Sequence, residues 1–352
     1  MKRHGSYAGI AVVVALFVLV LQGCDTSPPP AASLNAPGRI SPQTEFLFCH
    51  WNVENFFDDR NDGRTGPGDK EYDPLFANRP DLLHLKLAKL TEAILKMNAG
   101  KGPDILSIVE VESLRAAELL QKALNDKLTD PKLHYQHILM KEHAGGRHIA
   151  PAILTRLPVV QDRTRSLGNR QRILEGRVVV NGHELILVSS HWTSRLQESG
   201  KRGRADYADK IYGACNAIYH SNPAADFLVS GDFNDDPDDD SVTQHLHASG
   251  ELQTAGAVDS LRLVNLFAGK DPKEYGTHYY KKWHIFDQIL ISPGLLDGKG
   301  WSCDPQSLQV FNELHRAKDK LQRPWRFGSE HEKGERGYSD HFPVMVRLRV
   351  ER

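Results

Sequence analysis

Six short polar strings are the most informative feature of this sequence. Each places Asn, Glu, Asp or His at the end of an apolar run that is typical of a strand. Carboxylates, amides and imidazoles that gather at strand ends are the components of a metal-assisted phosphoester hydrolase. One string alone would say little, but the ordered set predicts such a centre. The strings are WNVEN (51–55), SIVEVE (107–112), SSHWTSR (189–195), GDFND (231–235), FDQILIS (286–292) and YSDHF (338–342).

The charge balance argues against a dedicated nucleic-acid binder. The 352 residues include 44 Lys and Arg and 45 Asp and Glu, which gives a net charge of −1. Residues 1–23 carry two positive and no negative side chains, so the rest of the chain has a net charge of −3. A protein that tracks a nucleic acid is usually strongly basic. Two local basic clusters, within Arg195–Arg204 and Arg316–Arg323, could contact phosphate or could be solvated surface.

The N-terminus resembles a bacterial export signal. A charged start precedes the apolar stretch 8–21, which is shorter than the roughly 20 residues of a membrane-spanning helix and suits a signal-peptide core. The string LQGC at 21–24 is similar to a lipobox, which implies cleavage before Cys24 and lipid on its thiol. We therefore expect 1–23 to be a lipoprotein signal peptide and the protein to be exported and membrane-anchored in a bacterial cell envelope, on the inner or the outer membrane. An ordinary signal peptide with an incidental cysteine is the alternative.

Residues 24–44 are rich in Pro, Ala and Ser and hold too few apolar side chains to fold, so they predict a disordered tether. The folded catalytic domain is expected at 45–352. Three cysteines remain there, Cys49, Cys215 and Cys303, and an odd number cannot all pair within one chain. Their disulfide state stays open, although Cys49 and Cys215 lie in apolar runs that favour buried thiols.

The pattern of apolar residues predicts a mixed fold. The dipeptide Asn181-Gly182 favours a hairpin turn, and the polar, Gly-rich stretch 58–80 is expected to be a loop. Strands that dominate, with helices between them, indicate two packed sheets covered by helices, an α+β sandwich in a single domain. Helices are expected at 82–97, 114–128 and 207–219, and strands at 46–51, 104–109, 152–154, 177–180, 184–190, 226–230, 285–292 and 343–350.

Together with the stretch NVENFFDDR (52–60), the six strings resemble the endonuclease/exonuclease/phosphatase superfamily, which includes deoxyribonuclease I and the neutral sphingomyelinases. The opening stretch is most similar to the bacterial extracytoplasmic lipoprotein branch. The resemblance covers residues 45–350. It implies a four-layer α/β/β/α sandwich, deoxyribonuclease I-like, with the active site at one edge of the two sheets.

The same resemblance implies a metal site. Glu110 matches the principal metal ligand, Asn52 the amide that reaches the metal or phosphate, and Asp340 a carboxylate near the metal. Glu112 competes with Glu110 because it lies two residues further along the strand, and Glu54 is a second acidic candidate or a surface residue. The expected cofactor is Mg²⁺, with Mn²⁺ possible, because hard divalent ions prefer carboxylate oxygen. One or two metals remain open.

Five residues are expected to carry the chemistry. The resemblance implies that His341 is the general base, that Asp287 orients it, and that His191 hydrogen-bonds a phosphate oxygen. A neutral imidazole needs a partner that fixes its tautomer, and its pKa suits proton transfer near neutral pH. Asp232 and Asn234 lie two residues apart, which in an extended segment aims both side chains the same way. They could orient the attacking water and bind a phosphate oxygen.

Arg147 and Arg195 are expected at the substrate rim. The acidic stretch Asp235–Asp240 is either a solvated turn or a second cation site. The sequence therefore predicts a monomeric, divalent-metal-dependent phosphodiesterase or nuclease whose substrate is a nucleic acid, a nucleotide-like diester or a phospholipid head group. A sphingomyelinase-like phospholipid phosphodiesterase is the alternative, and a catalytically inactive binding module is a third possibility from a different class.

Overall fold

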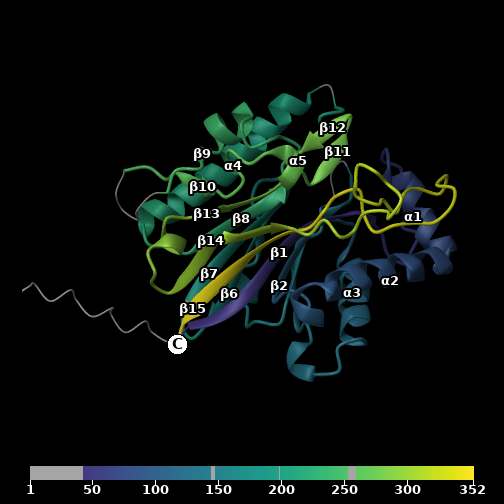
Figure 1. Cartoon of the computed structure of the whole chain (residues 1–352), viewed down its shortest axis with the longest axis horizontal. Coiled ribbons are helices and arrows are strands. Elements are labelled where there is room, and N and C mark those ends of the chain that lie inside the picture. Colours follow the sequence, from purple (N-terminus) through teal and green to yellow (C-terminus); the bar gives the residue numbers. More distant parts are fainter. Residues whose placement is uncertain (1–42, 144–146, 198, 253–258) are drawn as a thin grey trace, which may run out of the picture. The chain divides into compact units, whose positions relative to one another are not determined.

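Two mixed β-sheets pack face to face in the computed structural model (Figure 1), which describes residues 43–143, 147–197, 199–252 and 259–352. The expected signal peptide, Cys24 and nearly all of the expected tether lie outside these residues. The first sheet has six strands in the order β14-β15-β1-β2-β4-β3, in which only β1 and β2 pair in parallel. Its strands are β1 (Gln43–Phe56), β2 (Ile105–Val111), β3 (His137–Met140), β4 (Ala150–Thr155), β14 (Trp301–Val310) and β15 (Val344–Glu351).

The second sheet has seven strands in the order β5-β6-β7-β8-β13-β10-β9, and β7 and β8 run parallel at its centre. The predicted hairpin turn at Asn181-Gly182 joins β6 to β7, and both residues have positive φ, as such a turn requires. The strands are β5 (Arg165–Ser166), β6 (Arg172–Val180), β7 (His183–His191), β8 (Phe227–Asp232), β9 (Ala248–Ser249), β10 (Leu263–Asn265) and β13 (Asp287–Ile291). A separate hairpin consists of β11 (His278–Tyr280) and β12 (Lys282–His284).

Helices cover the outer faces of both sheets (Figure 1). Helices α1 (Asp69–Asn78), α2 (Pro80–Lys96) and α3 (Leu114–Asn125) pack on the first sheet, and α4 (Gly200–Ser221) packs on the second. The short α5 (Pro272–Tyr275) precedes β11. The three predicted helices are present, but the prediction of a loop throughout 58–80 is wrong. Pro74 and the glycines before residue 69 suggested a loop, but residues 69–78 form an amphipathic helix, α1, whose Tyr72, Leu75 and Phe76 are buried.

Three apolar layers separate these four layers of secondary structure, which confirms the predicted α+β sandwich. Strand β1 shows how one sequence serves two layers, because successive side chains of a strand point to opposite faces. Its Leu47, Cys49 and Trp51 pack against the helices, whereas Phe48 packs between the sheets. The third layer lies between the second sheet and α4. Near the end of β1, His50 and Asn52 continue the face that points toward the second sheet.

Each of the three cysteines in the described chain lies in a different apolar layer. Cys49 belongs to the layer under α2 and α3, Cys303 to the layer between the sheets, and Cys215 to the layer under α4. All three are free, buried thiols, and burial raises the pKa of each, in the case of Cys303 to about 12. They are therefore packing residues. Among the helices of the described residues, none is both long enough and apolar enough to cross a membrane.

Asp226 is a stability determinant at the start of β8, remote along the strand from Asp232. Its Oδ2 accepts the backbone N–H of Trp301 at 2.9 Å, and its Oδ1 is buried with no hydrogen-bond partner among the described residues. Burial raises the pKa of Asp226 to about 7, and the nearby Asp297 adds to the effect. Because the folded state binds this proton more tightly than the unfolded state, the aspartate lowers stability progressively from about pH 4 to pH 7.

We therefore expect Asp226→Asn to stabilise the protein at pH 8 by about 1–2 kcal/mol and to have a much smaller effect at pH 5. Asparagine keeps an oxygen for the Trp301 N–H and removes the charge. Urea unfolding of wild type and variant at both pH values measures the difference. An equal effect at the two pH values would show that the charge of Asp226 is not the cause.

Candidate active site

Neighbouring strand ends bring the predicted side chains together at one edge of the sandwich. In the second sheet, His191 of β7 and Asp287 of β13 are both paired with Asp232, the last residue of β8. In the first sheet, Asn52 near the end of β1 lies beside the end of β2, which carries Glu110. The amide of Asn52 joins the two sheets, because its Nδ2 donates to Glu110 Oε1 at 3.1 Å and to Asp232 Oδ2 at 3.0 Å.

A β-bulge aims Glu110 at the site. Strand β2 advances from Ile108 to Val111 while its partner β4 advances only from Ala152 to Ala150, so β2 contains one extra residue. Glu110 has a φ of 67°, a left-handed value that is uncommon for glutamate. Without this bulge, strict alternation would place Glu110 on the same face as Ile108, which packs against the helices. The bulge therefore turns the carboxylate to the inter-sheet edge.

The Glu110 carboxylate is ionised and suited to a hard cation. Its Oε2 accepts the backbone N–H of Asn55 at 2.8 Å. Burial alone would raise the pKa of Glu110, but His191, Arg147 and the N–H donors of Asn55 and Asn52 outweigh burial and lower the pKa to about 2. The anionic Glu110 oxygen is the kind of donor that Mg²⁺ or Mn²⁺ prefers, whereas the Asn52 side-chain oxygen accepts the backbone N–H of Glu54 at 3.0 Å.

Glu112 does not share this position. Its Oε1 accepts Arg64 Nε at 2.7 Å and its Oε2 accepts the backbone N–H of Asp58 at 3.1 Å. In the same loop, the backbone N–H groups of Asp62 and Arg64 donate to the Asp73 carboxylate. Glu112 thus fixes the loop after β1, and of the two glutamates only Glu110 contacts Asn52.

His341 and Asp287 form a buried dyad. His341 Nδ1 lies 2.6 Å from Asp287 Oδ2, and its Nε2 lies 3.8 Å from Asp232 Oδ2. Burial alone would lower the pKa of His341, but Asp287 and then Asp232 outweigh it, so the pKa lies well above its usual value. The backbone of the segment is held to β1, because Trp51 Nε1 donates to the His341 carbonyl at 2.9 Å and Ser339 Oγ donates to the Asn52 carbonyl at 2.6 Å.

His191 faces the carboxylates from the other side. Its Nε2 lies 3.6 Å from both Glu110 Oε1 and Asp232 Oδ2. Burial, followed by the positive charge of Arg172, lowers the pKa of His191 to about 3, so the ring is neutral at physiological pH. Burial raises the pKa of Asp232 to about 7 despite the opposing effect of His341. A neutral imidazole here can donate one hydrogen bond to a phosphate oxygen.

Asn234 and Asp340 flank these residues. The backbone N–H of Asn234 donates to Asp232 Oδ1 at 2.9 Å, and its φ of 53° turns the chain sharply after β8. The half-buried Asp340 forms, with His278 and His341, a group whose potential ligand atoms all lie within 4.8 Å of one another. Asp340 could therefore contribute an oxygen to a cation near His341.

The two rim arginines differ in their surroundings. Arg147 donates to Asp69 Oδ1 at 2.9 Å and to Asn55 Oδ1 at 2.6 Å, which places it next to the residue that holds Glu110. Arg195 instead turns to the acidic stretch, where its guanidinium pairs with the carboxylates of Asp235, Asp236 and Asp239. Arg204 and Lys201 pair with the same stretch through Asp235 and Asp240. This acidic turn is therefore largely neutralised from within the protein.

A buried polar cluster behind the dyad escaped the sequence analysis. His50 Nε2 lies 3.6 Å from Asp287 Oδ1, and its Nδ1 lies 3.2 Å from Ser107 Oγ, which in turn bonds Ser189 Oγ at 2.8 Å. Burial lowers the pKa of His50 to about 4, so it is a neutral support for Asp287. The signal was available, because His50 precedes Asn52 by two residues on one face of a strand.

Glu54 is a structural residue in this protein. Its carboxylate accepts the backbone N–H groups of Phe327 at 2.7 Å and Gly328 at 3.2 Å, and it pairs with Arg326 at 3.0 Å. The nearby Lys86 is fully buried and donates to the Tyr338 carbonyl at 3.0 Å. These contacts fix the segment 326–338 against the end of β1, and they leave Glu54 little freedom to bind a metal.

The chain is similar to known proteins both in its sequence profile and in its fold. A profile of the endonuclease/exonuclease/phosphatase family matches residues 48–350. No curated protein matches the chain. Among solved structures, a family protein from Bacteroides thetaiotaomicron has a TM-score of 0.53 and 15% identity, over 88% of this chain and 100% of that one.

Two further structures are similar to the same extent. D. rerio TDP2 in complex with a single-strand DNA product has a TM-score of 0.50 and 16% identity, over 87% of this chain and 99% of that one. A mutant of beta toxin from Staphylococcus aureus with bound magnesium ions has a TM-score of 0.50 and 12% identity, over 86% and 99% of the two chains. At identities this low, the structural similarity establishes a shared fold and no more.

Proposed function

The chain belongs to the endonuclease/exonuclease/phosphatase family of metal-dependent phosphoester hydrolases, and on this basis we propose that it hydrolyses small or short phosphodiesters. The observation that carries the proposal is the contact chain from Glu110 through Asn52 and Asp232 to His341 and Asp287. It joins an ionised carboxylate to a base–carboxylate dyad. His191 lies 3.6 Å from Asp232 in this chain, so two histidines with oppositely shifted pKa values flank the same carboxylate.

In the proposed mechanism, the deprotonated form of His341 accepts the proton of the attacking water at Nε2, while Asp287 holds the Nδ1 proton and stabilises the imidazolium that results. The neutral His191 donates to a phosphate oxygen, where negative charge grows in the transition state. Asp232 and Asn234 orient the water and the phosphate. Glu110, with Asn52 and Asp340, would hold the divalent ion, which supplies charge neutralisation at the phosphate.

Charge supports a short substrate over a long duplex. The chain after residue 23 carries a net charge of −3, and Arg195, Lys201 and Arg204 are occupied by the acidic stretch. In the second basic cluster, Arg323 is likewise paired with Asp319. The same pairing neutralises the acidic stretch, so this stretch repels a polyanion less than its sequence implies. The single-strand DNA product in one similar structure is compatible with a nucleotide-type diester.

A phospholipid phosphodiesterase is the second candidate. It is favoured by the resemblance of the string at 21–24 to a lipobox, since lipid on Cys24 would place the domain beside the bacterial envelope as a monomer anchored through its N-terminus. A product screen with Mg²⁺ or Mn²⁺ separates the candidates. We expect hydrolysis of bis-p-nitrophenyl phosphate and short oligonucleotides to exceed that of sphingomyelin. Faster sphingomyelin cleavage would favour the lipid enzyme, and no metal-dependent cleavage of any diester would favour an inactive binding module.

The preference for short substrates predicts a weak salt dependence of duplex binding. Each phosphate that a protein neutralises steepens the log–log salt slope by about 0.9. We expect the silenced variant His341→Ala to bind a duplex of about twenty base pairs weakly, with a slope shallower than about −2. Fluorescence anisotropy at several salt concentrations gives the slope. Tight binding at low salt with a slope near −4 or steeper would make the protein a duplex nuclease first.

A further inference from the structure

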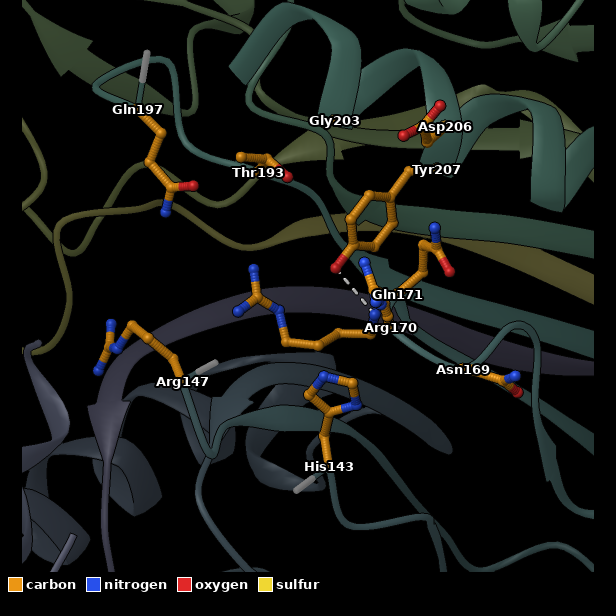
Figure 2. A pocket seen from close by; sticks show the side chains of 11 residues that line it. His143, Arg147, Asn169, Arg170, Gln171, Thr193, Gln197, Gly203, Asp206 and Tyr207 are labelled. Carbon is orange, nitrogen blue, oxygen red and sulfur yellow. Dashed lines mark hydrogen bonds between the residues drawn. The ribbon is translucent and has the colours of Figure 1, made fainter. Parts of the chain in front are cut away.

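A pocket of about 460 Å³ (Figure 2) is lined in part by Arg172, the residue that pairs with His191 across β6 and β7. Figure 2 shows His143 and Arg147 on one side of the pocket and Thr193, Gln197 and Tyr207 on the opposite side. The segment before β6 and the first residue of that strand supply a third group of lining residues, which includes Arg170 and Arg172. None of the five residues expected to carry the chemistry lines this pocket, but the predicted rim residue Arg147 does.

Two arginines that line the pocket are connected to the catalytic residues. On one wall, Arg172 is paired with His191 across β6 and β7, and its Nε donates to the His191 carbonyl at 3.3 Å. On the other wall, Arg147 donates to the side chain of Asn55, whose backbone N–H holds Glu110. The pocket is thus connected through Arg172 to His191 and through Arg147 and Asn55 to Glu110.

The wall formed by α4 is closely packed. Tyr207 is buried, and its hydroxyl accepts the backbone N–H of Arg172 at 2.8 Å. A Cβ on Gly203 would lie 2.6 Å from Thr193 Oγ1, so only glycine allows α4 this close to the segment after β7. These contacts fix the backbone from which Arg172 projects.

The lining has an excess of positive charge. Arg147 is paired with Asp69, but across the described ranges neither Arg170 nor Arg172 has a carboxylate within salt-bridge distance. One acidic residue, Asp206, lines the pocket with the three arginines. The first turn of α4 has no acidic side chain, and the N-terminus of a helix carries partial positive charge. An anion would satisfy both arginines, whose planar guanidinium groups match phosphate oxygens.

We propose that this pocket is a second phosphate subsite, in which Arg170 and Arg172 bind a phosphate adjacent to the one that is cleaved. The inference rests on the proposed function and narrows its substrate class to short phosphodiesters that carry a second phosphate. That phosphate could be a terminal monoester or the next internucleotide diester, and both present the same oxygens to the two arginines.

The test compares matched substrates and matched variants. Thymidine dinucleotide is compared with the same dinucleotide carrying a 5′- or a 3′-terminal phosphate and with the trinucleotide, for wild type, Arg170→Gln and Arg163→Gln. Arg163 is a control because it lies outside the pocket and pairs with Glu184 at 2.6 Å. We expect at least one added phosphate to lower KM by about tenfold in wild type and in Arg163→Gln, and this advantage to be lost in Arg170→Gln.

Calorimetry of the same ligands with the His341→Ala protein tests the phosphate subsite even if no substrate is hydrolysed. If wild type shows no metal-dependent hydrolysis of any diester, the proposed function fails, while a tighter, Arg170-dependent affinity for the phosphorylated ligands still supports the subsite. No advantage from an added phosphate, an advantage that survives Arg170→Gln, or an equal loss in Arg163→Gln overturns it. A gain from the terminal phosphates alone identifies a monoester as the ligand, and a gain from the trinucleotide identifies a diester.

Discussion

Replacing Glu110 with alanine is expected to lower kcat/KM on bis-p-nitrophenyl phosphate by about 10³-fold or more, because a bound metal stabilises the transition state by several kcal/mol. Each factor of ten corresponds to about 1.4 kcal/mol. Glu110 is the ionised carboxylate between Asn52 and the Asn55 N–H, and it would carry the largest share of the negative charge that holds a divalent ion. The measurement is steady-state kinetics over a Mg²⁺ titration, together with Mn²⁺ binding by equilibrium dialysis. EDTA should abolish wild-type activity and divalent ions should restore it.

The matched control is Glu112→Gln, two residues away in the same string. Glu112 contacts Arg64 and the Asp58 N–H, so its loss should reduce stability and leave most of the metal affinity in place. Equal activity of wild type and Glu110→Ala, or full activity in EDTA, would rule out the metal-centred mechanism. A larger metal-binding defect in Glu112→Gln than in Glu110→Ala would show that Glu112, and not Glu110, is the metal ligand.

His341→Ala is expected to lower kcat by about 10²–10⁴-fold, the usual contribution of a general base. Asp287→Asn should lower kcat by a smaller factor, since the Asp287 carboxylate orients the base and does not itself accept the proton. A pH profile distinguishes this role from a structural one. The Asp287 carboxylate stabilises the imidazolium and raises the pKa of His341. Its removal should therefore move the acid limb of kcat/KM to lower pH.

The double variant His341→Ala/Asp287→Asn tests whether the two residues act as one unit. Residues in one hydrogen-bonded unit are strongly non-additive, so the double defect should be close to that of His341→Ala alone. A defect equal to the product of the two single defects would show that they act independently. Lys282→Ala is a suitable control, because Lys282 is exposed and belongs to the β11–β12 hairpin.

Much of the site was predictable because strand ends are readable in sequence. Asn52, His191, Asp232 and Asp287 each end or begin an apolar run, and adjacent strands in the two sheets then bring them together. The strand pattern alone did not separate Glu110 from Glu112, and only the family resemblance favoured Glu110, because the difference depends on one extra residue in β2 and a left-handed backbone angle. Spacing of two implies a shared face only where the strand is regular.

Other features could not be predicted because they depend on contacts between residues far apart in the sequence. The string of aspartates from Asp235 and the basic residues from Arg195 each read as free surface charge, but in the fold they neutralise one another. Arg170 and Arg172 belong to no recognisable string, and only the pairing of β6 with β7 places Arg172 beside His191. Helix α1 was missed because Pro74 masks a helix whose stability comes from tertiary burial of Tyr72, Leu75 and Phe76.

The distribution of the free thiols gives this domain three independent internal probes. Cys49, Cys303 and Cys215 lie one in each apolar layer, and each is buried with a raised pKa. A buried thiol reacts with an alkylating reagent only while its surroundings are open, so its labelling rate under native conditions measures the free energy of that opening. Mass spectrometry of the three labelled peptides would therefore tell whether the helical layers detach before the two sheets separate, without introducing a single substitution.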